Sequence, residues 1–405
     1  MNDKIKIEKL AHLKSATIDL SASKSESNRA LIIKALADAP IDLHNLSNAR
    51  DTKIMQQLLQ SNEMALNVKD AGTTMRFLTA YCTSQNRETI LKGTPRMHER
   101  PIKILVEALH QLGAKIEYLE NEGYPPIKIY GLEQQKVDFL KVRGDISSQY
   151  ISALLMIAPT LHNGLTLQLE GKVGSWPYIT MTLNLMEHFG VNAQVNDHVI
   201  KVYPQQYIAN DYSIESDWSG ASYYYSFVAL AQDASCLLPG LRQNSFQGDQ
   251  AIVEMMQQLG VETTYEAGRV VLKKKDHAPS ATFDFTNCPD LAQTVAVVAA
   301  AKGIAVKMTG LESLRIKETD RIAALQAELA KIGGQLLEQG NSWHLIPSKK
   351  LPESVTIETY EDHRMAMAFA PLATKMQVIV EGPDVVQKSF PDFWQEVAKL
   401  GFTIY

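Results

Sequence analysis

A unit of about 25 residues recurs along this chain, and such a repeat limits the folds that the chain can adopt. In each copy an amphipathic helix pattern ends near Gly, and two runs of alternating residues then predict a strand, a turn and a second strand. A copy at 393–405 stops after one strand, and we expect residues 4–10 to supply its partner and bring the two chain ends together. A helix at 52–61 lacks most of its hairpin, which puts the symmetry of the first half in doubt. The four full copies span residues 104–131, 183–204, 252–275 and 324–348.

A second kind of helix lies between these units and is almost free of charge after its first turn. Because such a helix is apolar all round, we expect it to be buried on every side. The sequence therefore predicts an α/β protein of two domains, each with three repeats of helix and sheet around three buried parallel helices. The six buried helices are expected at 25–37, 72–82, 147–158, 219–231, 289–301 and 363–373.

The length of the chain also favours two domains. Its 405 residues are too many for one ordinary core and suggest domains of roughly 200 residues each. The change from one domain to the other is expected near 210–216, before the fourth buried helix. The first domain would then be 19–215, and the second would combine 1–18 with 216–405.

Composition excludes several classes of protein. A net charge of −5 argues against a general nucleic-acid binder, because such proteins carry a basic face. No stretch reaches the 18 or so apolar residues of a membrane span, and the first residues lack the apolar core of a signal peptide. The three cysteines show no metal-ligand spacing, which favours buried thiols in a reducing compartment. We therefore expect a cytoplasmic protein with neither membrane nor nucleic acid as partner.

Polar and cationic residues gather at the starts of the buried helices. Helix N-termini present unpaired N–H groups and a partial positive charge, which suit bound anions. A single Ser or Thr at such a start could simply cap its own helix, but cations clustered at several starts favour anionic ligands. The segments concerned are SKSESNR (23–29), DAGTTMR (70–76), PRMHERP (95–101), SSQ (147–149), GSWPY (174–178), PD (289–290), RIKETDR (315–321), DHR (362–364) and KSFPD (388–392).

In these segments the chain resembles the EPSP synthase family over nearly its whole length, with the motifs in the family's order. The resemblance implies the two-domain fold of enolpyruvyl transferases. It also implies transfer of the enolpyruvyl group of phosphoenolpyruvate to the 5-hydroxyl of shikimate 3-phosphate, in chorismate and aromatic amino acid biosynthesis. A member of this family is expected to be a glyphosate target. We expect this chain to act as a monomer.

The resemblance assigns residues to each substrate. The first domain is expected to bind mainly shikimate 3-phosphate, and the second to bind mainly phosphoenolpyruvate and to carry the catalytic groups. Residues implied to contact shikimate 3-phosphate are Lys24, Ser25, Arg29, Ser147, Ser148, Ser175, Tyr178, Ser313 and Lys317, with Gln149 between the two substrates. Residues implied to bind phosphoenolpyruvate are Gly72, Arg100, Arg321, Arg364 and Lys388, with Lys24 reaching it as well.

The chemistry requires a base near the 5-hydroxyl and an acid near the methylene carbon. The resemblance makes Asp290 the base and Glu318 the proton donor, with Lys24 as a third catalytic group. A Glu among cations is ordinarily ionised, so donation requires a site that offsets those cations. No metal or organic cofactor is implied, because lysines and arginines can stabilise the developing charge.

The chain departs from the family pattern at three places. Ser21-Ala22 stands where Pro-Gly is common, and Asp70 stands where the family often has Asn. Ser313 stands where some members use Asn to touch the shikimate ring. The departures predict a different turn at 21–22 and leave the contact of Ser313 open.

Two other functions remain as alternatives. UDP-N-acetylglucosamine enolpyruvyl transferase shares the fold, but it uses a cysteine on a mobile loop, and no cysteine here lies in a Gly-rich segment. A non-catalytic relative that only binds a ligand would usually lack the acid, the base or the cations, all of which this chain contains.

Overall fold

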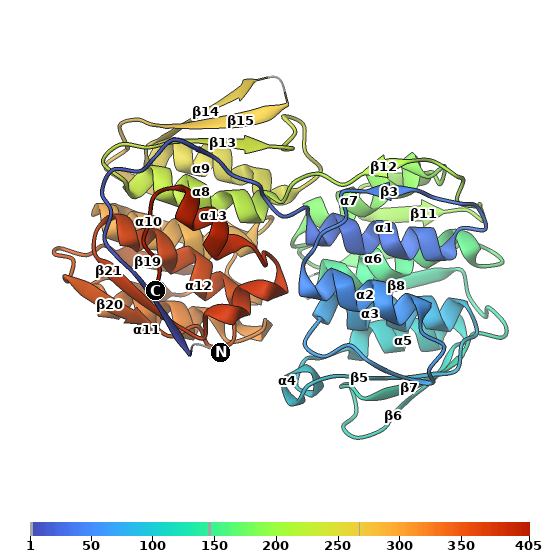
Figure 1. Cartoon of the computed structure of the whole chain (residues 1–405). Coiled ribbons are helices and arrows are strands. Elements are labelled where there is room, and N and C mark those ends of the chain that lie inside the picture. Colours follow the sequence, from blue (N-terminus) through green and yellow to red (C-terminus); the bar gives the residue numbers. More distant parts are fainter. Residues whose placement is uncertain (1–2, 145–146, 267) are drawn as a thin grey trace. The chain divides into compact units, whose positions relative to one another are not determined.

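The computed structural model describes residues 3–144, 147–266 and 268–405. The chain divides into two compact units (Figure 1). The N-terminal unit is Ser23–Ile214, and the C-terminal unit combines Met1–Ala22 with Glu215–Tyr405.

Each unit is built around three buried helices, at the places where the apolar patterns predict them. In the N-terminal unit these are α1 (Lys24–Leu36), α3 (Gly72–Ser84) and α6 (Ser148–Ile157), and each contacts the other two. In the C-terminal unit they are α8 (Trp218–Leu230), α10 (Ala292–Lys302) and α12 (His363–Phe369), again in mutual contact. Every side chain of α12 is buried, as expected for a helix with no polar face.

Four sheets with one common topology surround these helices. In each sheet two parallel strands are followed by the antiparallel hairpin that the repeat predicts, so the edge strand is the first strand of the hairpin. In the N-terminal unit, one sheet has the strand order β4 (Ala65–Asn67), β5 (Thr89–Lys92), β7 (Ile127–Gly131) and β6 (Lys115–Tyr118). The other has the order β8 (Phe139–Arg143), β9 (Leu165–Glu170), β11 (Val199–Val202) and β10 (Ala193–Asn196). In the C-terminal unit, one sheet has the strand order β2 (Ala16–Thr17), β13 (Ser235–Pro239), β15 (Arg269–Lys274) and β14 (Val261–Glu266). The other has the order β16 (Ser280–Asp284), β17 (Ala305–Thr309), β19 (Ser342–Ile346) and β18 (Gln335–Gln339).

Amphipathic helices pack one face against each core. Two of them, α5 and α9, end at Gly113 and Gly260, whose left-handed backbone terminates the helix. Along the described residues, no helix is both long and apolar enough to cross a membrane. These helices are α2 (Arg50–Gln60), α5 (Lys103–Leu112), α7 (Trp176–His188), α9 (Ile252–Leu259), α11 (Arg321–Lys331) and α13 (Phe393–Lys399), with the short α4 (Pro95–His98) before α5.

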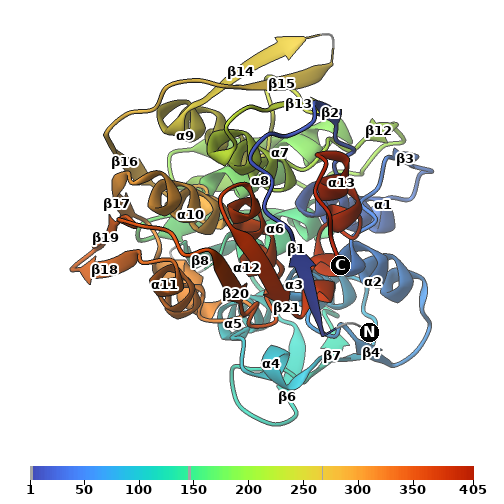
Figure 2. The same ribbon diagram turned by 60° about the vertical axis from the view of Figure 1, so that its left-hand side comes forward.

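The two chain ends meet in the C-terminal unit, as the incomplete repeat predicts. Strand β1 (Lys4–Ile7) pairs antiparallel with β21 (Gln377–Glu381), which pairs in parallel with β20 (Ser354–Ile357) (Figure 2). The backbones of Lys6 and Tyr405 exchange hydrogen bonds of 3.1 and 3.0 Å. The prediction that residues 4–10 complete the last repeat is confirmed.

The repeat with the missing hairpin is reduced to a minimal sheet. Two-residue strands β3 (Leu43–His44) and β12 (Tyr212–Ser213) pair in parallel before α2 and at the end of the unit. The side chain of Tyr212 also donates a hydrogen bond to Glu26 of α1, which fastens this sheet to the buried helices. The N-terminal unit is therefore less regular than a strict threefold repeat.

Two glycines of the C-terminal unit have the same backbone conformation but differ in the space available for a side chain. Both have left-handed backbones, with φ of 75° at Gly310 and 76° at Gly303. A Cβ at Gly310 would lie 2.3 Å from the Thr286 backbone nitrogen, whereas one at Gly303 would meet nothing within 4 Å. We expect Gly303→Ala to cost about 1 kcal/mol of unfolding free energy, and Gly310→Ala to cost roughly 1–3 kcal/mol more. Urea unfolding measures both variants, and equal losses would contradict the clash at Gly310.

Candidate active site

The start of α1 places a lysine beside a buried carboxylate. Ser23 caps the helix by accepting a hydrogen bond from the Glu26 backbone N–H at 3.4 Å. The next residue, Lys24, lies with Nζ 3.3 Å from Oδ2 of Asp51, and its side chain is 17% exposed. Lys24 is therefore partly accessible at a helix N-terminus, where its charge and the helix N–H groups act in the same direction.

Arg29 lies one turn further along α1 and is completely buried. Its guanidinium donates to Thr182 Oγ1 at 2.7 Å and to Ser152 Oγ at 3.0 Å, and also to the Ser25 carbonyl at 2.8 Å. Burial lowers the pKa of Arg29 to about 10, and it still remains charged at neutral pH. These hydrogen bonds fix Arg29 through neutral partners, and the Glu26 carboxylate on the same helix interacts with its positive charge.

The starts of α3 and α6 are joined by a side-chain hydrogen bond. Ser147 caps α6 by accepting from the Gln149 backbone N–H at 3.3 Å, and Ser148 is the first helical residue. The side chain of Gln149 donates to Thr73 Oγ1 at 3.1 Å. The predicted serines and Gln149 therefore share one end of the buried helices with the DAGTTMR segment.

Gly72 lies against arginine side chains. A Cβ at this position would lie 2.6 and 2.7 Å from the two terminal guanidinium nitrogens of Arg100. The absence of a side chain at Gly72 thus allows a guanidinium to approach the first turn of α3. The structure brings together Gly72 and Arg100, two residues predicted to bind the same substrate.

At the start of α7, Ser175 adopts a left-handed backbone with φ of 57°, and it makes no side-chain cap hydrogen bond. Such a conformation is uncommon for a residue other than Gly, and it is frequent at functional sites. One turn later, the ring of Tyr178 lies 5.8 Å from the Arg29 guanidinium carbon. Tyr178 therefore belongs to the surroundings of Arg29.

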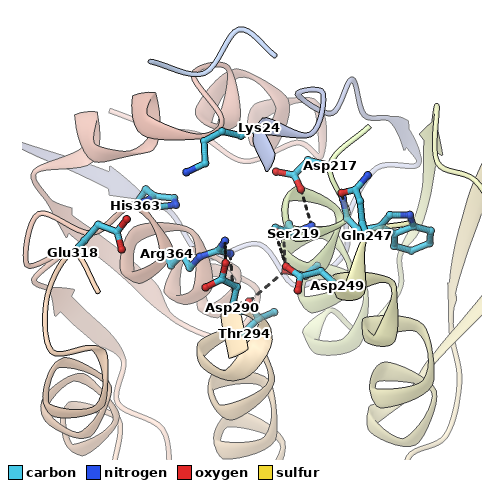
Figure 3. Close-up of polar contacts among 12 residues, drawn as sticks. Lys24, Asp217, Ser219, Gln247, Asp249, Asp290, Thr294, Glu318, His363 and Arg364 are labelled. Carbon is cyan, nitrogen blue, oxygen red and sulfur yellow. Dashed lines mark hydrogen bonds and ion pairs between the residues drawn. The ribbon is translucent and has the colours of Figure 1, made fainter. Parts of the chain in front are cut away.

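In the C-terminal unit, Asp290 pairs with two arginines, Arg321 and Arg364, and Figure 3 shows the contact with Arg364. It belongs to a short 3₁₀ helix, Pro289–Leu291, that leads into α10. Its two carboxylate oxygens accept from Arg321 Nη1 at 2.9 Å and from Arg364 Nη2 at 2.7 Å. Burial opposes ionisation, but Arg364, Lys317 and Arg321 hold the pKa of Asp290 below its usual range. Asp290 is therefore a carboxylate.

Arg321 is enclosed by carboxylates on every nitrogen. Besides Asp290, its Nη2 donates to Glu318 Oε2 at 2.8 Å and its Nε donates to Asp362 Oδ2 at 2.6 Å. Asp362 also caps α12 through the backbone N–H of Arg364, at 2.9 Å. The predicted base, Asp290, and the predicted acid, Glu318, thus contact the same buried guanidinium, that of Arg321.

The other predicted residues of this unit, Ser313, Lys317 and Lys388, lie in or next to two short 3₁₀ helices. Ser313 is half-buried in the 3₁₀ helix Glu312–Ile316, and Lys317 follows it directly. Lys388 is buried at the end of the 3₁₀ helix Pro383–Lys388. Of these, Lys317 acts on the centre through its charge, which lowers the pKa of Asp290.

Sequence reasoning missed three residues of this centre. Asp362 is part of the quoted DHR segment, and its place at a helix start could have revealed its role as a cap. The hydroxyl oxygen of Tyr223 accepts from Arg364 Nη1 at 3.3 Å, but in the sequence Tyr223 is one residue among several of an apolar helix. Asp249 gave no signal, because it lies in the 3₁₀ helix Gly248–Ala251, outside all of the motifs.

Asp249 is a second buried carboxyl group, and its pKa is shifted in the opposite direction to that of Asp290. Its Oδ2 accepts from Ser219 Oγ, and its Oδ1 is buried without a hydrogen-bond partner among the described residues (Figure 3). Burial is the largest cause that raises the pKa of Asp249 to about 7, and the charge of Asp290 raises it further, against Arg364 and Ser219. Of these two carboxyl groups, Asp290 therefore carries the charge, and Asp249 keeps its proton to a much higher pH than an ordinary Asp.

Among the described residues, no group of three or more His, Cys, Asp or Glu side chains is arranged to hold a metal ion. The centres are instead built from Lys and Arg at helix starts, with carboxylates and hydroxyls as their partners. Guanidinium and ammonium groups of this kind recognise phosphate and carboxylate oxygens. The arrangement is that of an enzyme site for small anionic substrates.

Comparison with known proteins identifies the family. The model of the EPSP synthase (3-phosphoshikimate 1-carboxyvinyltransferase) family matches residues 56–397. A 3-phosphoshikimate 1-carboxyvinyltransferase of Bacteroides fragilis is 46% identical over 394 residues, which cover 96% of each chain. That of Blochmanniella pennsylvanica is 34% identical, with 99% of each chain covered. A solved EPSP synthase of Acinetobacter baumannii has the same fold, with a TM-score of 0.81 over 99% of each chain at 19% identity. The chain belongs to the EPSP synthase family.

The raised pKa of Asp249 makes stability depend on pH. Because the folded state holds this proton more tightly than an unfolded chain, whose Asp pKa is 3.8, Asp249 stabilises most at low pH and this contribution is lost as pH rises toward 7. Asp249→Asn imitates the protonated form at every pH. We expect its melting temperature to rise relative to wild type between about pH 4 and pH 8. The exposed Asp276→Asn controls for charge removal, and a pH-independent difference for Asp249→Asn would contradict the assignment.

Proposed function

We propose that Asp290 and Glu318 perform the proton transfers of the EPSP synthase reaction in this chain. As a member of the family, the chain transfers the enolpyruvyl group of phosphoenolpyruvate to the 5-hydroxyl of shikimate 3-phosphate, with release of phosphate, in chorismate and aromatic amino acid biosynthesis. The observation that carries the residue assignment is the attachment of Asp290 and Glu318 to the same buried guanidinium, that of Arg321.

The reaction divides into an addition and an elimination. In the addition, the 5-hydroxyl oxygen bonds to C2 of phosphoenolpyruvate and its proton passes to Asp290. Glu318, which must be in its protonated form once the substrates are bound, gives its proton to C3. In the elimination, the C2–phosphate bond breaks, C3 returns its proton to the Glu318 carboxylate, and Asp290 returns its proton to the departing phosphate. Each group acts in both directions, as an acid and base on one substrate pair must.

The low pKa of Asp290 makes it a weak base until its arginines are diverted. In our proposal, the carboxylate of phosphoenolpyruvate accepts hydrogen bonds from Arg321 and Arg364 and so weakens their hold on Asp290. A carboxylate matches the planar fork of a guanidinium, so the exchange keeps both arginines paired. Binding of the anion then raises the proton affinity of Asp290 at the moment when a base is needed.

The remaining assignments divide by unit. We assign shikimate 3-phosphate mainly to the N-terminal unit and phosphoenolpyruvate mainly to the C-terminal unit, with Gly72, Arg100 and Gln149 as phosphoenolpyruvate contacts from the N-terminal unit. The buried guanidinium of Arg29 supports this division, because its side-chain hydrogen-bond partners are neutral hydroxyls and a phosphate nearby would stabilise its charge. The residues assigned to shikimate 3-phosphate are Lys24, Ser25, Arg29, Ser147, Ser148, Gln149, Ser175, Tyr178, Ser313 and Lys317.

Cysteine chemistry of the UDP-N-acetylglucosamine type receives no support. All three cysteines, Cys82, Cys236 and Cys288, are buried. Burial raises the pKa of Cys236 to about 12 and moves those of Cys82 and Cys288 in the same direction. A buried, protonated thiol is a poor nucleophile or acid at neutral pH.

We further propose that the protein acts as a cytoplasmic monomer, without nucleic acid or membrane as partner. The net charge of −5 supports the absence of nucleic-acid and membrane partners, because a nucleic acid or an anionic membrane surface would require a basic face. Glyphosate is the expected inhibitor of a family member.

Phosphate release tests the function directly. Purified protein should release phosphate from phosphoenolpyruvate when shikimate 3-phosphate is present, and little without it. Equal release with UDP-N-acetylglucosamine as acceptor would transfer the assignment to the alternative enzyme, and no release with either acceptor would favour a non-catalytic relative.

Replacing the proton-transfer groups should abolish most of the turnover. We expect Asp290→Asn and Glu318→Gln to lower kcat by at least about a hundredfold, because neither amide can accept or donate the proton. The Michaelis constants should change far less. Glu312→Gln, an exposed glutamate in the preceding 3₁₀ helix, serves as control and should retain wild-type turnover. Near wild-type kcat in either variant would show that its residue has another role.

A further inference from the structure

The guanidinium of Arg76 is a buried charge that pairs with no carboxylate among the described residues. Arg76 lies in the first turns of α3 and is 6% exposed. Its Nε and Nη1 are buried and have no hydrogen-bond partner among the described residues. Its described contact is with the ring of Tyr150, whose centroid lies 5.6 Å from the guanidinium carbon.

The nearby acidic side chains are engaged elsewhere. Asp70, two residues before α3, accepts from Arg50 Nη2 at 2.9 and 2.7 Å. Asp51, whose carbonyl is 3.5 Å from Thr74 Oγ1, faces Lys24 with its carboxylate. A buried ion without a counter-charge is costly, so its retention calls for a partner that the free protein lacks.

Arg76 and Arg100 converge on the same point of α3. A Cβ at Gly72 would lie 2.5 Å from Arg76 Nη1 and 2.6 Å from Arg100 Nη1. Because both nitrogens lie so close to one point, the two guanidinium groups are close neighbours. Like charges at this separation repel each other unless an anion lies between or beside them.

The helix itself adds positive potential at this place. The residue before α3 is Ala71, which has no side-chain acceptor to satisfy the first N–H groups. In contrast, Ser23, Ser147 and Asp217 cap the buried helices α1, α6 and α8 with their side chains. The start of α3 therefore has N–H groups that its N-cap residue does not satisfy, next to Arg76 and Arg100, a combination that suits a doubly charged oxyanion.

We infer that Arg76 binds the phosphate group of phosphoenolpyruvate, and the phosphate that leaves, together with Gly72 and Arg100. The inference rests on the proposed function, which assigns phosphoenolpyruvate to Gly72 and Arg100. A phosphate is the match because it offers three oxygens to two guanidiniums and the helix N–H groups, whereas a carboxylate offers only two. Arg76 would then stabilise the bond that breaks during elimination, since negative charge accumulates on the departing oxygen.

This role makes a prediction that a packing role does not. If Arg76 only supported Tyr150, Arg76→Met would lower the melting temperature and leave substrate binding little changed. If Arg76 serves the phosphate, Arg76→Met removes an uncompensated buried charge, so the melting temperature of the free protein should stay equal or rise. The loss of function would accompany an unchanged or improved stability.

The experiment compares Arg76→Met and Arg76→Lys with a matched control. We expect Arg76→Met to raise the KM for phosphoenolpyruvate and the inhibition constant of inorganic phosphate about 10- to 100-fold, the effect of losing a charged hydrogen bond. The KM for shikimate 3-phosphate should change far less. Arg76→Lys should lie between, because an ammonium keeps the charge and loses the fork. Arg87→Met removes an arginine beyond the other end of α3, where it donates to the Ser61 carbonyl, and should leave both constants unchanged.

A thermal shift with inorganic phosphate alone separates this inference from the proposed function. Phosphate should raise the melting temperature of wild type and of Arg87→Met, and this rise should be lost in Arg76→Met. If wild type showed this pattern of thermal shifts but no enolpyruvyl transfer, the proposed function would be overturned and the phosphate site would stand. Active wild type would overturn the inference if Arg76→Met kept the phosphate shift and the phosphoenolpyruvate KM. A lowered melting temperature with equal losses for both substrates would also overturn it, in favour of a structural role.

Discussion

Burial of six helices on every side is the constraint from which the rest of this structure follows. A helix without a polar face can be stable in water only when other elements cover its whole circumference, so each unit wraps three such helices with sheets and amphipathic helices. The polar residues of a buried helix are then confined to its ends. At the N-terminal ends, unpaired N–H groups add their partial charge to any cation placed there. The chemistry of the protein is thus confined to helix starts by the way in which its core is built.

The two units manage buried positive charge in different ways. In the C-terminal unit, Arg321 contacts three carboxylates, so the free protein pays little for its burial and the anion must exchange partners with Asp290. In the N-terminal unit, Arg29 rests on hydroxyls and a carbonyl, and Arg76 has two nitrogens without a partner among the described residues. The first arrangement ties ligand binding to the proton affinity of a catalytic group. The second keeps a charge ready for a ligand at the expense of stability.

Much of the fold and of the centre was predictable from local patterns. The all-apolar helices and the hairpins that follow Gly occur where their periodicity places them, because these signals depend on neighbours in the sequence. The helix-start motifs led to Asp290, Glu318, Arg321 and Arg364, which the structure brings together. Asp249 could not be found in this way, since it lies outside the motifs, in a 3₁₀ helix that packs against α8. Arg76 was visible in a motif, but its want of a counter-charge is a property of the folded chain.

The sequence by itself determined the class of fold, the meeting of the chain ends and the family, because each depends on periodicity or on ordered motifs along one dimension. Only the tertiary structure decided which charges are paired. Asp70 precedes α3 directly but pairs with Arg50 of α2, while Asp362 lies 41 residues from Arg321 and binds it at 2.6 Å. The physical reason is that ion pairing and pKa depend on distances of a few ångströms and on burial, and both arise when segments remote in sequence pack together. Residue type can therefore indicate a charged site, whereas the protonation state and the ion-pair partners of each group are determined by the tertiary structure.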